Sequence, residues 1–300
     1  MGAFSRSWKI TKLSLKIINN DKRLMLFPIL GGSFSILYIL ILIFPLYFFG
    51  LFIKFLEGFN KDYLVWIVMF AALFIVYLGI AFCAIFFNVC TIYTVKVRFD
   101  GGNAGSMESI RFALNKLSKI FLWSLIFATI GLVLGAIDKL CKSAEKSDNA
   151  IVSILGFIGD LVNSIFGFAW GLVSAFVLPL MVYRDVGPIE ALKKSEELLK
   201  KTWGESLTRD IGFGLVGGVV IILGIVIFGG LAFLVASLGI GFIIVVIVTG
   251  VVYLITLIIV GTLLNTIFNT ALFIYADKGV IPLGYNEETM KAVFRVKEKK

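Results

Sequence analysis

Long apolar stretches alternate with short polar segments along the whole chain. Five stretches are long enough to form membrane-spanning helices, because about 20 residues at a rise of ~1.5 Å cross a bilayer core of ~30 Å. The last stretch, residues 211–276, holds no charged residue and is too long for one span, so we divide it near Ser237–Gly241, where glycine favours a turn. The pattern therefore predicts six spans, with a re-entrant segment in place of one of them as the alternative: 27–53, 63–95, 120–137, 160–183, 211–236 and 240–276.

The polar segments before the odd-numbered spans are amphipathic. Apolar residues recur at helical spacing before the third span, at Met107, Ile110, Leu114, Leu117 and Phe121. Another helix is predicted from Pro188, because proline is tolerated in the first helical turn. Residues 1–26 have the same pattern, with Phe4, Trp8, Leu15 and Ile18 on one face. Each odd-numbered span is thus expected to follow an interfacial helix, and residues 277–300 form a polar tail.

A short motif recurs where even-numbered spans end. Tyr183–Gly187 and Tyr275–Gly279 both read Tyr-x-Asp-x-Gly, and a proline follows each. We interpret the chain as three tandem units, each with an interfacial helix, a membrane hairpin and a polar exit. The alternative is that no duplication exists, because tyrosine favours the interface and Asp-x-Gly ends many helices.

Composition and charge support this threading. Hydrophobic residues make up 59% of the chain and charged residues 16%, whereas soluble domains carry roughly 25% charged residues. Of the 28 Lys and Arg residues, 23 lie in the amino-terminal segment, the second and fourth loops and the tail. With six spans, these four segments all lie on the same side of the membrane. The positive-inside rule makes that side cytoplasmic. We therefore expect a multi-pass protein of the cell membrane with both termini in the cytoplasm.

The net charge of +9 lies mainly next to the spans. In that place it favours anionic lipid headgroups as partners, and not nucleic acid. The residues predicted to contact headgroups are Lys9, Lys12, Lys16, Arg111, Lys116, Lys119, Lys193, Lys194, Lys200 and Lys201.

Asp160 is the one ionisable residue inside an apolar run, which makes it a functional candidate. Counting inward from Arg184, 24 residues cover ~36 Å, so Asp160 is expected at the outer interface. Residues 151–159 would then form a surface or partly inserted helix. Two interpretations follow, a solvated structural carboxylate and a proton or ion site.

Asn88, Asn265 and Asn269 are the other candidates for a polar site. They lie near the predicted cytoplasmic interface in the second and sixth spans, accompanied by threonines. They could form a hydrophilic pocket, or they could make the interhelical hydrogen bonds common in membrane bundles. Glycine pairs at Gly131–Gly135, Gly167–Gly171 and Gly214–Gly218 have the spacing that permits close helix packing.

The sequence offers little for catalysis. It contains no histidine, no paired carboxylates within one span and no glycine-rich phosphate loop before a helix. Cys83, Cys90 and Cys141 have no spacing typical of a metal site or a disulfide framework. We therefore predict no cofactor and disfavour an enzyme.

Several short segments resemble one family of proteins. They are Arg6–Trp8, Asp21–Pro28, Phe168–Gly171, Gly187–Leu192, Lys201–Glu205 and Tyr275–Gly279. Together they resemble a large prokaryotic family of multispanning membrane proteins, a domain of unknown function. That family is distantly similar to the membrane domain of some glycerophosphodiester phosphodiesterases. The resemblance implies a fold and a membrane location, and it implies no activity or site residue.

Two functional hypotheses result. In the first, the protein is a non-enzymatic membrane component that organises lipid, a membrane-protein partner or copies of itself through its basic cytoplasmic segments. In the second, it is a small permease or channel for an apolar or lipid-like substrate. The scarcity of polar residues between the two interfaces favours the first hypothesis.

Overall fold

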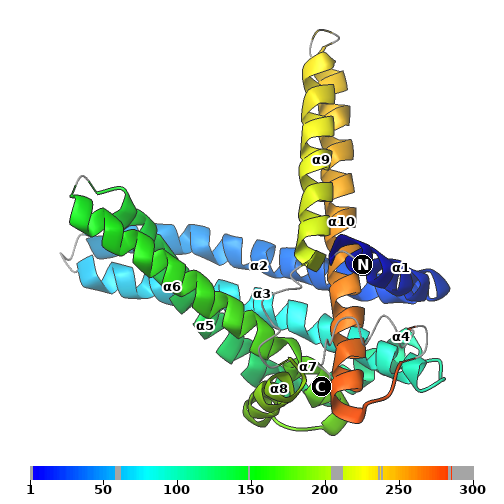
Figure 1. The fold of residues 1–300 in the computed structure, drawn as a ribbon. Coiled ribbons are helices and arrows are strands. Elements are labelled where there is room, and N and C mark those ends of the chain that lie inside the picture. Colours follow the sequence, from blue (N-terminus) through cyan, green and yellow to red (C-terminus); the bar gives the residue numbers. More distant parts are fainter. Residues whose placement is uncertain are drawn as a thin grey trace. The chain divides into compact units, whose positions relative to one another are not determined.

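The computed structural model describes residues 3–57, 62–147, 149–203, 212–235, 237, 239–282 and 285. Every regular element in these ranges is helical (Figure 1). The elements are α1 (Ala3–Asn20), η1 (Lys22–Met25), α2 (Leu26–Glu57), α3 (Asp62–Phe99), α4 (Ser106–Leu114), α5 (Leu117–Glu145), α6 (Ala150–Ala175), α7 (Val177–Arg184), α8 (Pro188–Trp203), α9 (Gly212–Leu234) and α10 (Ile240–Lys278).

Five helical segments in the described part are long and apolar enough to cross a membrane. They are Lys22–Leu42, Phe70–Phe99, Leu117–Glu145, Ala150–Arg184 and Ile240–Lys278. In α9, the described apolar segment Ile221–Leu234 is shorter than a span. Several apolar helices point to a membrane location. The described apolar part of the predicted fifth span, Ile221–Leu234, is too short to decide whether that span exists.

The chain divides into two compact units. The terminal unit contains Met1–Pro28, Thr94–Ala104 and Glu197–Lys300, and the central unit contains Ile29–Tyr93 and Gly105–Glu196. Both ends of the chain therefore belong to the terminal unit.

In the terminal unit, α10 packs against α1 and η1. Most side chains from Leu263 to Ile274 are buried, whereas Ile240, Phe242 and Val245 at the other end of α10 are exposed. The break between α9 and α10 includes Gly239, whose φ of 115° is open to glycine and strained for other residues. This break, at residues 235–239, overlaps the predicted Ser237–Gly241 turn.

A buried hydrogen bond joins the two ends of the chain within the terminal unit. Ser14 Oγ and Tyr285 Oη are 2.6 Å apart, and the Tyr285 ring also packs edge-on against Phe99. Burial raises the pKa of Tyr285 to about 12, so its phenol stays neutral at physiological pH.

In the central unit, α5 and α6 run side by side (Figure 1). Asn149 begins α6 as its N-cap, with its side-chain oxygen accepting from the backbone N–H groups of Ile151 and Val152. At the other end of the pair, Trp123 packs on Trp170 with ring centroids 5.8 Å apart. Most side chains of α7 are fully buried, so the core of this unit lies at the α7 end of the hairpin.

Three element boundaries differ from those the pattern predicts. Residues 151–159 form the first part of α6 and are continuous with the span, because Gly156 lets this part pack tightly on α5. The helix predicted through Met107–Phe121 ends at Leu114, and Lys116 starts α5 with a new N-cap. The span predicted at 160–183 is interrupted at Phe176, between α6 and α7.

Candidate functional site

Polar side chains of the central unit gather at both ends of the α5–α6 hairpin. At the α7 end, the chain leaves α7 through Asp185, which has a left-handed backbone (φ 54°). Lys116 Nζ lies 2.6 Å and Lys119 Nζ 2.7 Å from Asp185 Oδ1. Lys119 Nζ also donates to the Asp185 backbone oxygen at 2.5 Å. The two lysines therefore connect the beginning of α5 to the end of α7, and we call Lys116, Lys119 and Asp185 the Asp185 clamp.

The two lysines change the acidity of Asp185. The hydrogen bond from Lys116 has the largest effect, followed by that from Lys119. Together with the charges of the two lysines, they lower the pKa of Asp185 from an ordinary value of 3.8 to about 2. Because the pKa of Asp185 is lower in the folded protein, the ion pair stabilises the fold at every pH above about 4. This stabilisation is lost as the pH falls from about 4 to about 2. Because 60% of the Asp185 side chain is exposed, the contribution is that of a surface ion pair, at most about 1 kcal/mol.

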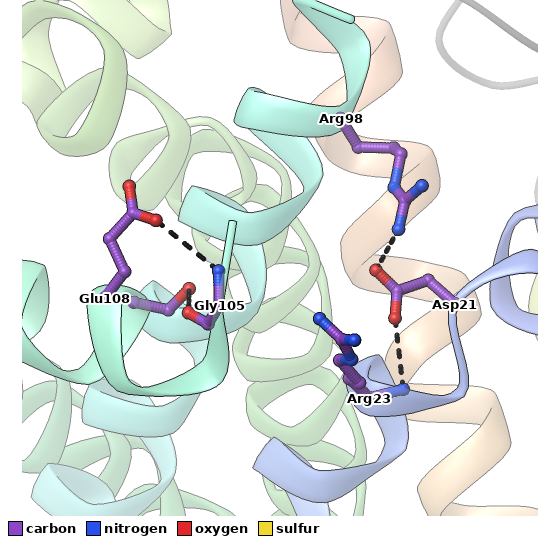
Figure 2. A network of polar contacts seen from close by, with 6 residues as sticks. Asp21, Arg23, Arg98, Gly105 and Glu108 are labelled. Atoms are coloured by element: carbon purple, nitrogen blue, oxygen red, sulfur yellow. Dashed lines mark hydrogen bonds and ion pairs between the residues drawn. The ribbon is translucent and has the colours of Figure 1, made fainter. Parts of the chain in front are cut away.

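Beside this clamp, α4 is attached to α3. Tyr93 Oη donates to Glu108 Oε1 at 2.8 Å, and the Tyr93 ring stacks on Phe112 at 4.2 Å between centroids. Figure 2 shows that Glu108 also accepts from the backbone N–H of Gly105 at the beginning of α4. These contacts explain how a short amphipathic helix is held in place.

A second group lies at the loop end of the α5–α6 hairpin. Lys142 Nζ is 2.8 Å from Asp138 Oδ1, and the charge of Asp160 in α6 also acts on Lys142. One turn further along α6, Asn163 Nδ2 donates to the backbone oxygen of Leu134 at 3.1 Å. We call Asp138, Lys142, Asp160 and Asn163 the hairpin polar cluster.

In the terminal unit, an ion pair with a buried carboxylate connects the N-terminal segment to α3. Asp21 caps η1 by accepting from the backbone N–H of Arg23 at 3.2 Å, and it pairs with the guanidinium of Arg98 (Figure 2). The Asp21 side chain is 4% exposed. Sequence reasoning missed this pair, because Asp21-Lys22-Arg23 reads as a solvated charge run and Arg98 is far away in the sequence.

The residues predicted to form one polar site belong to different units of the chain. The charge of Asp160 acts on Lys142 of α5 in the central unit. Asn265 and Asn269 belong to the terminal unit, where Asn269 Nδ2 donates to Asn265 Oδ1 one turn away at 3.4 Å. Asn88 lies in α3 of the central unit, next to the buried residues Val89 and Cys90. The structure therefore associates Asp160 with Asp138, Lys142 and Asn163, none of which the sequence singled out.

The predicted headgroup residues differ in exposure and in the contacts that they make. Lys12, Lys16, Arg111, Lys193 and Lys200 are exposed. Lys116 and Lys119 bind Asp185, and Lys194 pairs with Glu190 one turn before it in α8. The side chains of Lys9 and Lys201 lie outside the described part of the chain.

Within the described ranges, no group of three or more Cys, Asp or Glu side chains is placed to hold a metal ion. The three cysteines are free thiols. Neither the Asp185 clamp nor the hairpin polar cluster pairs a nucleophile with a base, as a catalytic site would.

The comparisons with known proteins give one match, which covers residues 67–282. No curated protein and no solved structure matches the chain. Nothing in these comparisons supports the expected similarity to the membrane domain of glycerophosphodiester phosphodiesterases. The matched segment runs from α3 to the end of α10 and includes both the Asp185 clamp and the hairpin polar cluster. The chain belongs to the family described as a family of unknown function, DUF6159.

Proposed function

We propose that the protein crosses the cell membrane six times, with both termini and its basic segments in the cytoplasm. Five helices meet the length and hydropathy requirement, and α9 supplies the sixth span. With 23 residues, α9 is about 35 Å long, which is sufficient for a ~30 Å core. The alternation of Lys- and Arg-rich segments supports the same threading.

A labelling experiment tests the sixth span. Lys146, beyond α5, and Val280, beyond α10, are both exposed, and six spans put them on opposite sides of the membrane. In a background with Cys83, Cys90 and Cys141 replaced by alanine, we expect a membrane-impermeant maleimide added outside intact cells to label Lys146→Cys and not Val280→Cys. Labelling of both from one side would mean that α9 does not cross the bilayer.

The element order also supports three tandem units. A short helix precedes a pair of long apolar helices three times, at α1 before α2 and α3, at α4 before α5 and α6, and at α8 before α9 and α10. Each unit would thus place one amphipathic helix on the cytoplasmic surface.

Within the membrane, we propose a non-enzymatic role in organising anionic lipid. The observation that carries this proposal is the two-sided surface of α1, which buries Ser14, Ile17 and Ile18 and exposes Lys12 and Lys16. Lys22 and Arg23 are also exposed, and the exposed apolar surface of α2 begins directly after them at Leu26. Basic side chains next to a span attract anionic headgroups by about 1 kcal/mol each.

Replacing Lys12, Lys16, Lys22 and Arg23 with glutamine is expected to lower the preference for anionic lipid several-fold. The reason is the loss of about 1 kcal/mol of attraction for each charge near the headgroups. The measurement compares spin-labelled phosphatidylglycerol with spin-labelled phosphatidylcholine bound to the protein in nanodiscs.

The matched control exchanges lysine and arginine at the same four positions, which keeps the charge and is expected to retain the preference. High salt should remove the difference between the two variants, because it screens exposed charges. An unchanged preference in the glutamine variant would contradict the lipid-organising role.

The second candidate is a small permease or channel for an apolar or lipid-like substrate. The described part of α9 and α10 supports it, since Gly229, Gly230 and Gly241 have open space around them and large apolar side chains are exposed. Such an uncharged surface can line a path for an apolar molecule without ionisable groups.

A further inference from the structure

The loop end of the α5–α6 hairpin pairs a charged helix with an apolar one. From Asp138 to Lys146, the end of α5 and its C-cap carry three lysines and two acidic residues, whereas α6 carries no charged residue from Ala150 to Gly159. The large apolar side chains that α6 exposes at this end are Ile151, Val152, Ile154, Leu155, Phe157 and Ile158. Charged and apolar surfaces are therefore divided between two neighbouring helices.

Contacts between the two helices fix their register. Ser153 Oγ of α6 donates to the backbone oxygen of Glu145 at 2.8 Å. A Cβ added at Gly156 would lie 2.6 Å from the backbone nitrogen of Glu145 and 2.8 Å from the backbone oxygen of Cys141. The charged stretch of α5 and the apolar start of α6 therefore lie at the same level along the hairpin.

The charged stretch of α5 also has an apolar side. Lys139, Lys142 and Lys146 follow one another at spacings of three and four residues, so they form one row along the helix. Leu140, which is 70% exposed, precedes Lys142 by two residues and lies ~160° from it around the helix axis. Leu140 therefore faces away from the lysine row.

The apolar surface at the start of α6 is continuous with the rest of that helix. Ile151, Leu155, Ile158 and Val162 are all exposed and recur every three or four residues, which places them in one row. This row belongs to the candidate span Ala150–Arg184. The apolar surface that the span offers to lipid thus extends to the loop end of the hairpin.

An upright hairpin does not suit both helices. With 29 residues, α5 is ~44 Å long, which exceeds the ~30 Å bilayer core. If the charged stretch lay within the core, the lysine row would be separated from water at a high cost. If that stretch lay outside the core, the apolar start of α6 would stand in water beside it. Tilting the hairpin end removes both costs, because the charged and apolar surfaces point in different directions.

We propose that the loop end of the hairpin lies obliquely in the membrane surface farther from the Asp185 clamp, with phospholipid as its partner. The start of α6 and Leu140 contact acyl chains, and the lysine row faces headgroups and water. Amphipathic helices in this position bury their apolar face by ~5–10 Å. The inference rests on α5 and α6 crossing a membrane, and it does not depend on lipid binding by α1.

Spin-label accessibility in nanodiscs of phosphatidylglycerol and phosphatidylcholine tests the proposal. One label at a time is attached to Leu140→Cys, Leu155→Cys or Lys142→Cys in the full-length protein, with the three native cysteines replaced by alanine. The measurement is the ratio of accessibility to oxygen, which concentrates among acyl chains, to accessibility to a water-soluble nickel chelate. We expect this ratio to be several-fold higher at Leu140 and Leu155 than at Lys142, the matched control at the same level.

A similar ratio at all three positions would overturn the proposal. A uniformly low ratio would mean that the hairpin end projects into water, and a uniformly high ratio that it lies within the core. Low accessibility to both reagents at Leu155 would also overturn it, because another protein would then cover α6. Ile158→Cys and Lys139→Cys repeat the comparison at exposed neighbouring positions, so the result does not depend on one variant. The ratio is independent of which side is cytoplasmic, so the number of spans is tested separately.

Discussion

Replacing Arg98 with glutamine is expected to destabilise the terminal unit by about 3 kcal/mol or more. The carboxylate of Asp21 is 4% exposed, and its contacts are the Arg98 guanidinium and the backbone N–H of Arg23. Removing one partner of a buried ion pair leaves an uncompensated charge, which typically costs about 3–5 kcal/mol. The measurement is the free energy of unfolding in mixed detergent micelles, monitored by tryptophan fluorescence.

The neighbouring arginine provides a matched control. Arg23 is exposed and gives Asp21 its backbone N–H, which Arg23→Gln retains. We expect this variant to change stability by less than about 0.5 kcal/mol. Asp21→Asn combined with Arg98→Gln should recover much of the loss, because no buried charge remains. Equal losses for the two single arginine variants would contradict the role assigned to Arg98.

The second large effect is expected at Gly156, where alanine should destabilise the central unit by about 2–3 kcal/mol. The atoms that an added Cβ would meet are the backbone atoms of α5, at 2.6 Å, 2.8 Å and 2.9 Å, and they cannot move aside as a flexible side chain can. The helices must separate, and overpacking of this kind typically costs about 1–3 kcal/mol.

The control is Gly171, which lies in the same helix with nothing within 4 Å of its added Cβ. Alanine there should be neutral or stabilise α6 by up to about 1 kcal/mol, because alanine is the better helix former. In the same unfolding assay, we therefore expect the Gly156→Ala change to lower the free energy of unfolding and the Gly171→Ala change to leave it unchanged or raise it. A loss at Gly171 as large as that at Gly156 would mean that helix contact does not cause the effect.

The hydropathy pattern was sufficient to place the helices. Apolar runs need no partner to be recognised, so five spans and the break before α10 follow from the sequence. The amphipathic segments also form helices at α1, α4 and α8. The short polar interruption at Asn115 and Lys116 was missed, because the three- and four-residue spacing continues through it.

The polar contacts could not be predicted because they depend on register between helices. Arg98 and Asp21 are 77 residues apart, and Lys116 and Asp185 are 69 apart. Asp138 and Asp160 belong to different helices, α5 and α6, which pack closely at Gly156 and Gly159. Of the glycine pairs that the sequence pointed to, Gly131 lies close to Tyr77 and Gly167 lies near Leu134, whereas Gly135 and Gly171 have no neighbour within 4 Å.

The hydrogen bond between Ser14 and Tyr285 has a consequence for biosynthesis. The two residues are separated by 271 positions, so α1 reaches the ribosome exit long before its partner exists. At a typical synthesis rate, the interval is on the order of 10–50 s. Throughout that time the apolar face of α1 needs a temporary cover, such as the membrane surface or a chaperone. Assembly of the terminal unit is therefore completed only after synthesis has passed Tyr285.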